Sequence, residues 1–336
     1  MGQTLSFPAL HKHKSSGGNA SMFYSTTAMQ GWRVTMEDAH VAELSLDKGV
    51  ETSNAFFAVY NGHSGVVCGA MSKFSGTNVH KRLMSEGAYH EERYEEALKS
   101  AFLGTDEDWC ANPPVANDPS GCTAVAALVT GDGKIFVANA GDSRLVISVK
   151  GKAKPLSLDH KPSNKNDAAR IKAAGGYVEY TRVNGRLGLS RALGDFDLKK
   201  NPSLSPEEQI ITADPDMTIH DIAEEDEFLV LACDGIWECL SSQEVVDFIR
   251  LKVSKGNELP KISKMLCDYC LAPDTEPPSN GCDNMMVLII AILNGQSIDE
   301  WRVWVTDHVK QRYGYKMPGF VPQLYDKYQL KKFNAQ

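Results

Sequence analysis

The chain has 336 residues, of which 42% are hydrophobic and 23% are charged, as expected for a globular protein that folds in water. No apolar run approaches the roughly 20 residues needed to cross a bilayer, and the net charge of −8 argues against a nucleic-acid-binding protein. The length suits one large domain or two modest ones. Eight scattered cysteines and the lack of a signal peptide predict a reducing compartment.

Residues 1–21 are rich in Ser, Gly and Lys, which predicts an N-terminal tail without regular structure. The tail begins "MGQTLS", which fits the pattern for myristoylation at Gly2. The "HKHK" stretch at 11–14 adds basic charge, the second signal that a single acyl chain needs for stable membrane attachment. The alternative interpretation of this segment is a plain polar tail.

Apolar and β-branched runs predict strands over 54–60, 123–129, 134–140, 144–148, 227–233 and 285–293. The turn "TGDGK" (130–134) predicts a tight hairpin between two of them. Amphipathic stretches predict helices over 94–103, 165–176 and 241–253, the last opening on a capping box of Ser241 and Glu244. Because the strands are apolar on both faces, we expect an α+β fold with helices packed outside the sheets.

The remaining segments define the domain limits. Residues 200–209 and 272–282 are rich in Pro and Ser and predict loops, whereas 294–336 predicts a helix followed by an aromatic, basic tail. Cys267 and Cys270 form a lone CxxC, which favours two residues on one helix face over a zinc site. We therefore expect a tail over 1–21, one folded domain over 22–293 and a C-terminal helix and tail over 294–336.

Acidic residues recur where predicted strands begin or end. Such oxygen ligands, without a Cys/His set, select hard cations such as Mg²⁺ or Mn²⁺. Taken singly, each of these residues is more often a turn or cap residue, but their joint placement beside strand ends favours one metal site. The candidates are Glu37, Asp38, Asp142, Asp234 and Asp283.

Eight segments occur in one order over roughly residues 22–293: "GWRVTMEDAH", "FFAVYNGHSG", "SGCTAVAALV", "NAGDSRLVIS", "LSLDHKP", "GLSRALGDFDLK", "ACDGIWECLSSQEVV" and "CDNMMVLII". They resemble the successive motifs of the type 2C, metal-dependent Ser/Thr protein phosphatases, and eight ordered motifs are far more specific than one short pattern. The resemblance implies a four-layer α-β-β-α sandwich, in which two antiparallel sheets stack face to face between helices.

The resemblance also implies a metal centre with two Mg²⁺ or Mn²⁺ ions that lower the pKa of a bridging water and orient it for attack on a phosphomonoester. By similarity, Asp234 and Asp283 ligate one ion. Glu37 binds the other, partly through water, and Gly62 offers its backbone carbonyl. Asp142 corresponds to a third, weaker metal position.

Three further residues receive catalytic roles by the same resemblance. Asp38 orients metal-bound water, Arg33 holds the phosphate through bidentate hydrogen bonds, and His63 is the general acid for the leaving Ser or Thr oxygen. The plain alternatives are a surface salt bridge for Arg33 and a core or turn position for His63. The motif context favours the catalytic roles.

Position 61 departs from the family, which places a metal-bridging Asp there, whereas this chain has Asn61. An amide is neutral and offers one good oxygen. Losing the bridging charge between two repelling cations should weaken the binding of at least one. Asn61 is compatible with an engineered inactive enzyme, with a natural phosphatase-like binding protein, or with residual activity through the other ligands. The Asn-Gly pair is also prone to deamidation.

Two functions therefore compete. The first is metal-dependent hydrolysis of phosphoserine and phosphothreonine in proteins, slowed by Asn61; the second is an inactive, phosphatase-like binding or regulatory protein. A nucleotide-handling hydrolase is disfavoured because no P-loop or GxGxxG motif occurs. The expected partners are phosphorylated proteins, without nucleic acid. We expect a monomer in the cytoplasm, with a peripheral membrane-associated fraction through Gly2 and with a nuclear location left open.

Overall fold

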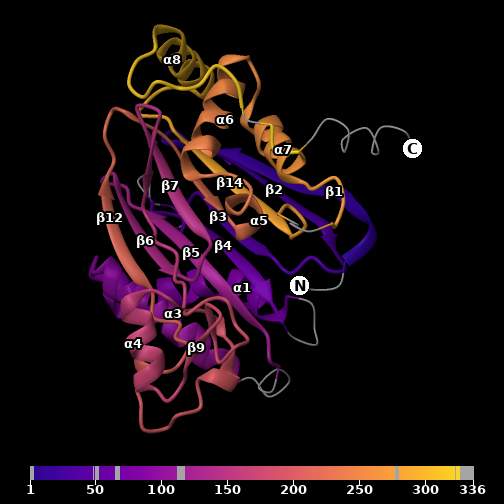
Figure 1. Cartoon of the computed structure of the whole chain (residues 1–336). Coiled ribbons are helices and arrows are strands. Elements are labelled where there is room, and N and C mark those ends of the chain that lie inside the picture. Colours follow the sequence, from indigo (N-terminus) through magenta and orange to yellow (C-terminus); the bar gives the residue numbers. More distant parts are fainter. Residues whose placement is uncertain are drawn as a thin grey trace. The chain divides into compact units, whose positions relative to one another are not determined.

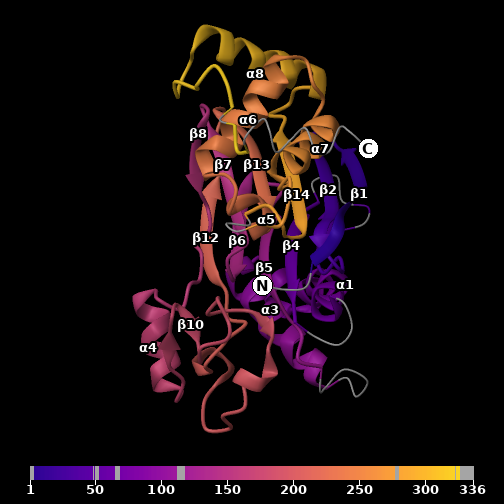
Figure 2. The same ribbon diagram turned by 45° about the vertical axis from the view of Figure 1, so that its right-hand side comes forward.

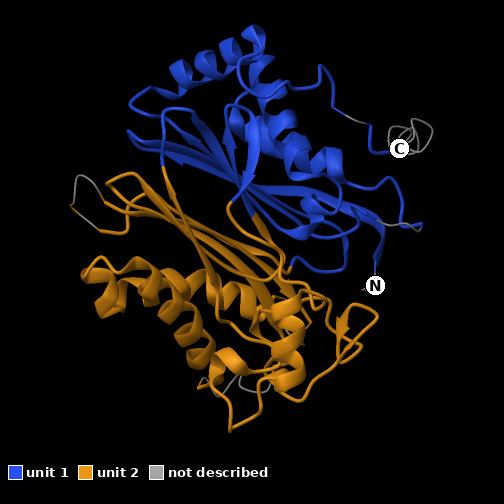
Figure 3. Ribbon diagram, turned by 60° about the vertical axis from the view of Figure 1, so that its left-hand side comes forward, with its two compact units in different colours: residues 1–36, 145–155, 222–336 blue, residues 37–144, 156–221 orange. Residues whose placement is uncertain are grey.

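The computed structural model describes residues 4–47, 49, 53–64, 69–111, 118–276, 280–321 and 323–325. The chain divides into two compact units (Figure 3). Unit 1 comprises residues 1–36, 145–155 and 222–336, and unit 2 comprises residues 37–144 and 156–221. Each unit is built on its own six-stranded sheet. No helix in the described ranges is long and apolar enough to span a membrane.

The sheet of unit 1 is built around two strands, β13 and β14, which are buried along their whole length. They pair antiparallel, and β14 also pairs antiparallel with β2, so that β14 is hydrogen-bonded on both sides. Such central, doubly covered strands explain the continuous apolar runs in the sequence. In order across the sheet, the strands are β1 (Thr4–Gly18), β2 (Met22–Arg33), β14 (Met285–Ile292), β13 (Asp226–Ala232), β7 (Arg144–Val149) and β8 (Lys152–Pro155).

The prediction of an unstructured tail over residues 1–21 is wrong for residues 4–18, which form β1. This strand runs antiparallel to β2, with Lys14 opposite Thr27 and Gly18 opposite Phe23. The side chain of Lys12, one of the basic residues assigned to membrane contact, is only 7% exposed and forms an ion pair with Asp268 at 2.6 Å. Gly2 lies outside the described residues.

Strand β2 is polar in sequence and yet largely buried. Its Ser25 and Thr27 hydroxyls lie 3.0 and 2.9 Å from the hydroxyl of Ser263 on helix α7 (Leu259–Cys270). Burying a hydroxyl is costly unless it is hydrogen-bonded. The three hydroxyls satisfy one another, which allows a polar strand to lie beneath a helix.

Two helices of unit 1 begin at a capping box. Helix α6 (Ser242–Ser254) opens on the predicted capping box of Ser241 and Glu244, and the short helix α5 (Asp234–Trp237) follows β13. Both cysteines of the CxxC are buried on α7, as predicted for one helix face. Helix α8 (Ile298–Gln311), predicted as the start of a separate C-terminal segment, belongs to unit 1 and lies beside α6 (Figure 1).

The sheet of unit 2 contains the predicted hairpin, in which β5 (Gly121–Val129) and β6 (Lys134–Ala140) pair antiparallel. Strand β4 (Ala55–His63) lies on the other side of β5, between it and β3 (Ala39–Glu43). Strand β12 (Asp216–Asp221) pairs with β6, and the two-residue strand β11 (Leu193–Gly194) pairs with the start of β5.

Helices α1 (Ala70–Ser85) and α3 (Tyr94–Cys110) contact strands of this sheet, and the short α2 (Gly87–His90) joins them. Helix α4 (Lys165–Ala173) lies beside the small hairpin of β9 (Val178–Glu179) and β10 (Arg182–Val183), at one end of unit 2 (Figure 2). Short 3₁₀ helices cover Phe196–Leu198 and Pro206–Glu208.

One charged pair is buried inside unit 1. Glu227 on β13 is fully buried and lies 3.0 Å from the Nε atom of Arg250 on α6, which is 1% exposed. Burial raises the pKa of the Glu227 carboxyl, and the Arg250 charge opposes this rise. The Ser148 hydroxyl donates a further hydrogen bond of 2.6 Å to the same carboxylate. The carboxylate is therefore compensated by two partners from β7 and α6.

Removing one member of this pair should leave the charge of the other member buried without a partner. We expect Arg250→Met to lower the free energy of unfolding by about 3–5 kcal/mol. The double variant Arg250→Met, Glu227→Gln should recover part of that loss, because no charge is then left uncompensated. Urea denaturation of the two variants measures both effects, and equal stabilities for the single and double variants would contradict the assigned pairing.

Candidate metal and phosphate site

The carboxylates of unit 1 lie at one end of its two central strands. Strand β13 ends at Ala232 and pairs there with Val287 near the start of β14. The chain then turns into α5, whose first residue is Asp234, while Asp283 lies two residues before β14 begins. Both carboxylates are half-buried. The antiparallel pairing thus brings two residues that are 49 positions apart to the same end of these two central strands.

Gly235 allows this close approach. A β-carbon at position 235 would lie less than 3.0 Å from the carbonyl oxygen of Asn284, a distance that real side chains avoid. The Asp-Gly pair therefore has a physical reason. The aspartate carries a candidate ligand oxygen, and the glycine lets the turn after β13 approach the segment before β14.

Arg33 reaches the same edge from the neighbouring strand β2, which it ends. Its guanidinium forms an ion pair with the carboxylate of Asp283. The Asn284 side-chain amide holds the adjacent backbone by donating hydrogen bonds of 2.9 Å to the carbonyls of Gln30 and Thr35. The Arg33 guanidinium, a cation that can bind phosphate oxygens, therefore lies beside a candidate metal ligand.

The corresponding edge of unit 2 lies at the end of β4, where Asn61 pairs with Thr123 of β5. The Thr123 and Ser143 hydroxyls are 2.7 Å apart, which places the turn after β6 at the same edge. Asp142 lies in that turn and forms an ion pair with Lys161. The Lys161 ammonium would compete with a divalent ion for this carboxylate, as fits a weaker metal position.

Glu37 meets the end of β4 through its backbone. A β-carbon on Gly62 would lie less than 3.0 Å from the Glu37 carbonyl oxygen, and the Ser72 hydroxyl of α1 donates a hydrogen bond to that same carbonyl. Gly62 therefore allows a close approach between backbone segments in unit 2, as Gly235 does in unit 1. Asp38, the next residue, is buried.

His63, the last residue of β4, has a partner that the sequence analysis missed. Its Nε2 atom lies 2.7 Å from a carboxylate oxygen of Asp195. Burial disfavours the charged imidazole, but the Asp195 carboxylate outweighs burial and raises the pKa of His63. Asp195 directly follows β11, whose pairing with β5 brings it to this edge. The motif "GLSRALGDFDLK" contains Asp195, and this motif was the available signal.

The oxygen donors present fit hard divalent cations. They comprise three half-buried carboxylates, of Glu37, Asp234 and Asp283, together with the backbone carbonyl of Gly62 and the side-chain amide of Asn61. Within the described ranges, no group of three or more His, Cys, Asp or Glu side chains is arranged to hold a metal. The candidates are divided, with Asp234 and Asp283 in unit 1 and the others in unit 2.

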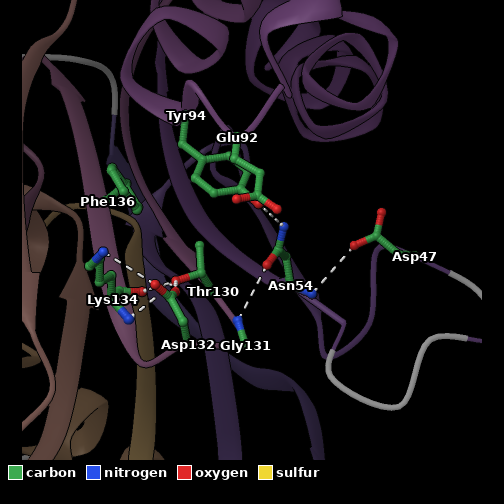
Figure 4. Close-up of a pocket in the computed structure, with 9 residues that line it drawn as sticks. All are labelled: Asp47, Asn54, Glu92, Tyr94, Thr130, Gly131, Asp132, Lys134 and Phe136. Carbon is green, nitrogen blue, oxygen red and sulfur yellow. Dashed lines mark hydrogen bonds and ion pairs between the residues drawn. The ribbon is translucent and has the colours of Figure 1, made fainter. Parts of the chain in front are cut away.

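A pocket of about 420 Å³ in unit 2 lies elsewhere (Figure 4). It is lined by Asn54, directly before β4, and by Thr130 and Asp132 in the β5–β6 turn. These residues stand at the opposite end of the strands from Asn61 and His63. The cavity is therefore separate from the candidate catalytic edge.

Comparison with known proteins decides the family. The family model described as protein phosphatase 2C matches residues 22–277. The chain belongs to the protein phosphatase 2C family. Protein phosphatase 2C homolog 2 of Aspergillus flavus is 49% identical over 310 residues, covering 89% of this chain and 70% of that protein. Protein phosphatase 2C homolog 2 of Schizosaccharomyces pombe is 46% identical, covering 94% of this chain and 85% of that protein.

Solved structures agree with the fold class. A phosphatase from Toxoplasma gondii matches this protein phosphatase 2C chain with a TM-score of 0.70 at 26% identity, covering 84% of this chain and 96% of that one. A serine-threonine phosphatase 2C from the same organism matches with a TM-score of 0.69 at 20% identity, covering 86% and 98%, which supports the fold alone. The predicted α+β class, with two antiparallel sheets flanked by helices, is confirmed.

The pairing of His63 with Asp195 depends on Gly121, the first residue of β5. A β-carbon at this position would lie less than 3.0 Å from both His63 Nε2 and the Asp195 carboxylate. We expect Gly121→Ala to separate the pair and to lower the phosphatase kcat by about 10²-fold, the scale of one general-acid contribution. Steady-state kinetics on a phosphopeptide measures the effect.

Gly87→Ala is the matched control, because no atom lies within 4 Å of its added β-carbon. It should leave kcat unchanged. Equal rates for the Gly121→Ala and Gly87→Ala variants, with both folded by circular dichroism, would refute a catalytic need for the His63–Asp195 contact.

Proposed function

We propose that this protein hydrolyses phosphoserine and phosphothreonine in proteins with two Mg²⁺ or Mn²⁺ ions. The observation that carries the proposal is that hard oxygen donors stand at strand ends where a glycine admits a neighbouring backbone, as at Gly62 and Gly235. The position of Arg33 beside Asp283 adds a phosphate-binding cation. Family membership supports protein phosphatase activity in general.

The proposed metal ligands follow the family resemblance. Asp234 and Asp283 hold one ion, and Glu37 with the carbonyl of Gly62 holds the other. When bound, the two ions supply Lewis-acid activation of the attacking water and neutralise charge on the phosphoryl group. Asp142 provides a third, weaker position, because it shares its charge with Lys161.

The protein's own groups bind the substrate and move the proton. Arg33 donates hydrogen bonds to two phosphoryl oxygens and fixes the phosphorus for in-line attack. His63 protonates the leaving Ser or Thr oxygen, which otherwise departs as an unstable alkoxide. The Asp195 carboxylate, 2.7 Å away, orients the His63 ring and stabilises its charged form before the proton is given up. Asp38 orients the attacking water through a hydrogen bond.

Asn61 favours a second candidate, an inactive phosphatase-like protein that binds phosphoproteins without turnover. The amide is neutral and directs N–H donors at one of the two cations that the family's aspartate would bridge. Binding of phosphate through Arg33 does not need that bridge. Slow hydrolysis is our first choice, because the other proposed ligands, Arg33 and His63 are all present.

We also propose a cytoplasmic monomer with a fraction attached to membranes through a myristoyl group on Gly2. The supporting pattern is "MGQTLS". Because Lys12 is engaged by Asp268, the basic contribution to membrane binding falls to Lys14, which is exposed. One acyl chain with so little added charge gives only reversible attachment.

Asn61→Asp should raise the rate of phosphopeptide hydrolysis with Mn²⁺ by about two or more orders of magnitude, because a bridging carboxylate acts on the transition state through both ions. It should also tighten metal binding, measured by calorimetry. Samples must be fresh and mass-checked, since deamidation of Asn61 creates the same aspartate. Equal hydrolysis by both forms would refute the bridging role of position 61.

Gly2→Ala should shift the membrane-bound fraction in a eukaryotic cell into the soluble fraction, since the acyl acceptor is lost. Cell fractionation measures the shift, and labelling with an alkyne-bearing myristate tests acylation directly. An unlabelled wild-type protein, or unchanged partitioning of the variant, would leave the N-terminus as a plain polar segment.

A further inference from the structure

Unit 1 contains a pocket of about 360 Å³ that is lined by residues of α8 and by residues beside the start of β13 and the end of β14. The pocket lies at the start of β13 and the end of β14, whereas Asp234 and Asp283 lie at the other end of these strands. Glu225 and Asp234 flank the seven residues of β13, which span roughly 23 Å at about 3.3 Å per residue. The pocket is therefore a separate site.

One wall of the pocket is aromatic. Trp304 and His308 are one turn apart on α8 with ring centroids 4.5 Å apart, and Tyr313 continues the row at 4.6 Å from His308. Buried contacts fix this wall. The indole nitrogen of Trp301 donates a hydrogen bond of 2.8 Å to the carbonyl of Glu227, and His308 Nδ1 lies 3.7 Å from the Glu227 carboxylate. The aromatic wall is thus held in place before any ligand arrives.

The other lining residues carry several hydrogen-bond acceptors. Glu225 is already engaged, by the Tyr313 hydroxyl at 2.8 Å and by Lys150. Glu224 beside it is exposed, and its carboxylate has no ion pair or hydrogen bond with any residue in the described ranges. The amide oxygens of Asn294 and Gln296 likewise accept no hydrogen bond from the described part of the chain. The lining groups that have no partner among the described residues therefore favour a ligand with several hydrogen-bond donors and a positive charge.

We propose that this pocket binds the side chain of an arginine from a partner polypeptide. A guanidinium is planar, carries five N–H donors and no acceptor, and stacks on aromatic rings. It can therefore lie against Trp304 and donate two parallel hydrogen bonds to Glu224, with N–H groups left for the amide oxygens. A lysine ammonium is compact and more strongly hydrated, and cannot form the bidentate pair. The proposal does not depend on catalysis.

The test uses the full-length protein and the peptide acetyl-Gly-Arg-Gly-amide. The citrulline peptide is the control ligand, because it keeps the shape and loses the charge, and a lysine peptide keeps only the charge. Binding is followed through the indole N–H signals of the five tryptophans by NMR, with Trp304→Phe identifying the signal of Trp304. We expect the arginine peptide to shift the Trp304 signal saturably, with a dissociation constant at least tenfold lower than those of the citrulline and lysine peptides.

Two variants assign the contact. Glu224→Gln should weaken binding of the arginine peptide by about tenfold or more, the scale of a charged hydrogen bond. Asp299→Asn is the matched control, because it removes the same charge from α8 at a residue that pairs with Arg302 and does not line the pocket. It should bind as wild type. No saturable shift, equal binding of arginine and citrulline peptides, equal binding of arginine and lysine peptides, or unchanged binding by Glu224→Gln would each overturn the proposal.

Discussion

Contact between backbones at the ends of strands determines where this protein can place its charged groups. At Gly62 and Gly235 a neighbouring carbonyl oxygen occupies the space of a β-carbon. Each of these glycines follows a residue with an oxygen-bearing side chain, so the ligand and the close approach are encoded in two adjacent positions. The rest of each sheet serves this arrangement, since buried strands such as β13 and β14 fix the register that brings Asp234 and Asp283 to one edge.

The same constraint extends to the proton donor. Gly121 leaves room for His63 and Asp195 to meet, and β11 is only two residues long, enough to bring Asp195 to the first residue of β5. Ion pairs also hold some of the proposed metal ligands. Arg33 is paired with Asp283 and Lys161 with Asp142, so each of these proposed metal ligands already has a cation beside it. A divalent ion bound at Asp283 would weaken its pair with Arg33 and release that guanidinium for a phosphate.

The apolar strands, the β5–β6 hairpin and the capped helix α6 were predictable from local pattern, because burial and capping leave direct traces in sequence. Strands β1 and β2 were not. β1 is a mostly exposed edge strand whose Ser, Gly and Lys residues resemble a tail. β2 can be buried despite its polar residues because the Ser25 and Thr27 hydroxyls hydrogen-bond with Ser263, more than 230 positions away. Asp195 was missed for a similar reason, since its partner His63 is distant in sequence. Placement at predicted strand ends indicated the acidic candidates, whereas the resemblance to a family supplied their separate roles and the roles of Arg33, Gly62 and His63.

The central claim is that Asp234 and Asp283, at the paired ends of β13 and β14, bind one divalent metal ion. Paramagnetic broadening by Mn²⁺, followed on backbone amide signals by NMR, tests it most directly. At substoichiometric Mn²⁺ the amides of Gly235 and Asn284 should broaden together and first, whereas the amide of Glu225, at the far end of β13, should be unaffected. Broadening confined to one of these two amides, or spread evenly over the amides beside exposed carboxylates, would contradict the account.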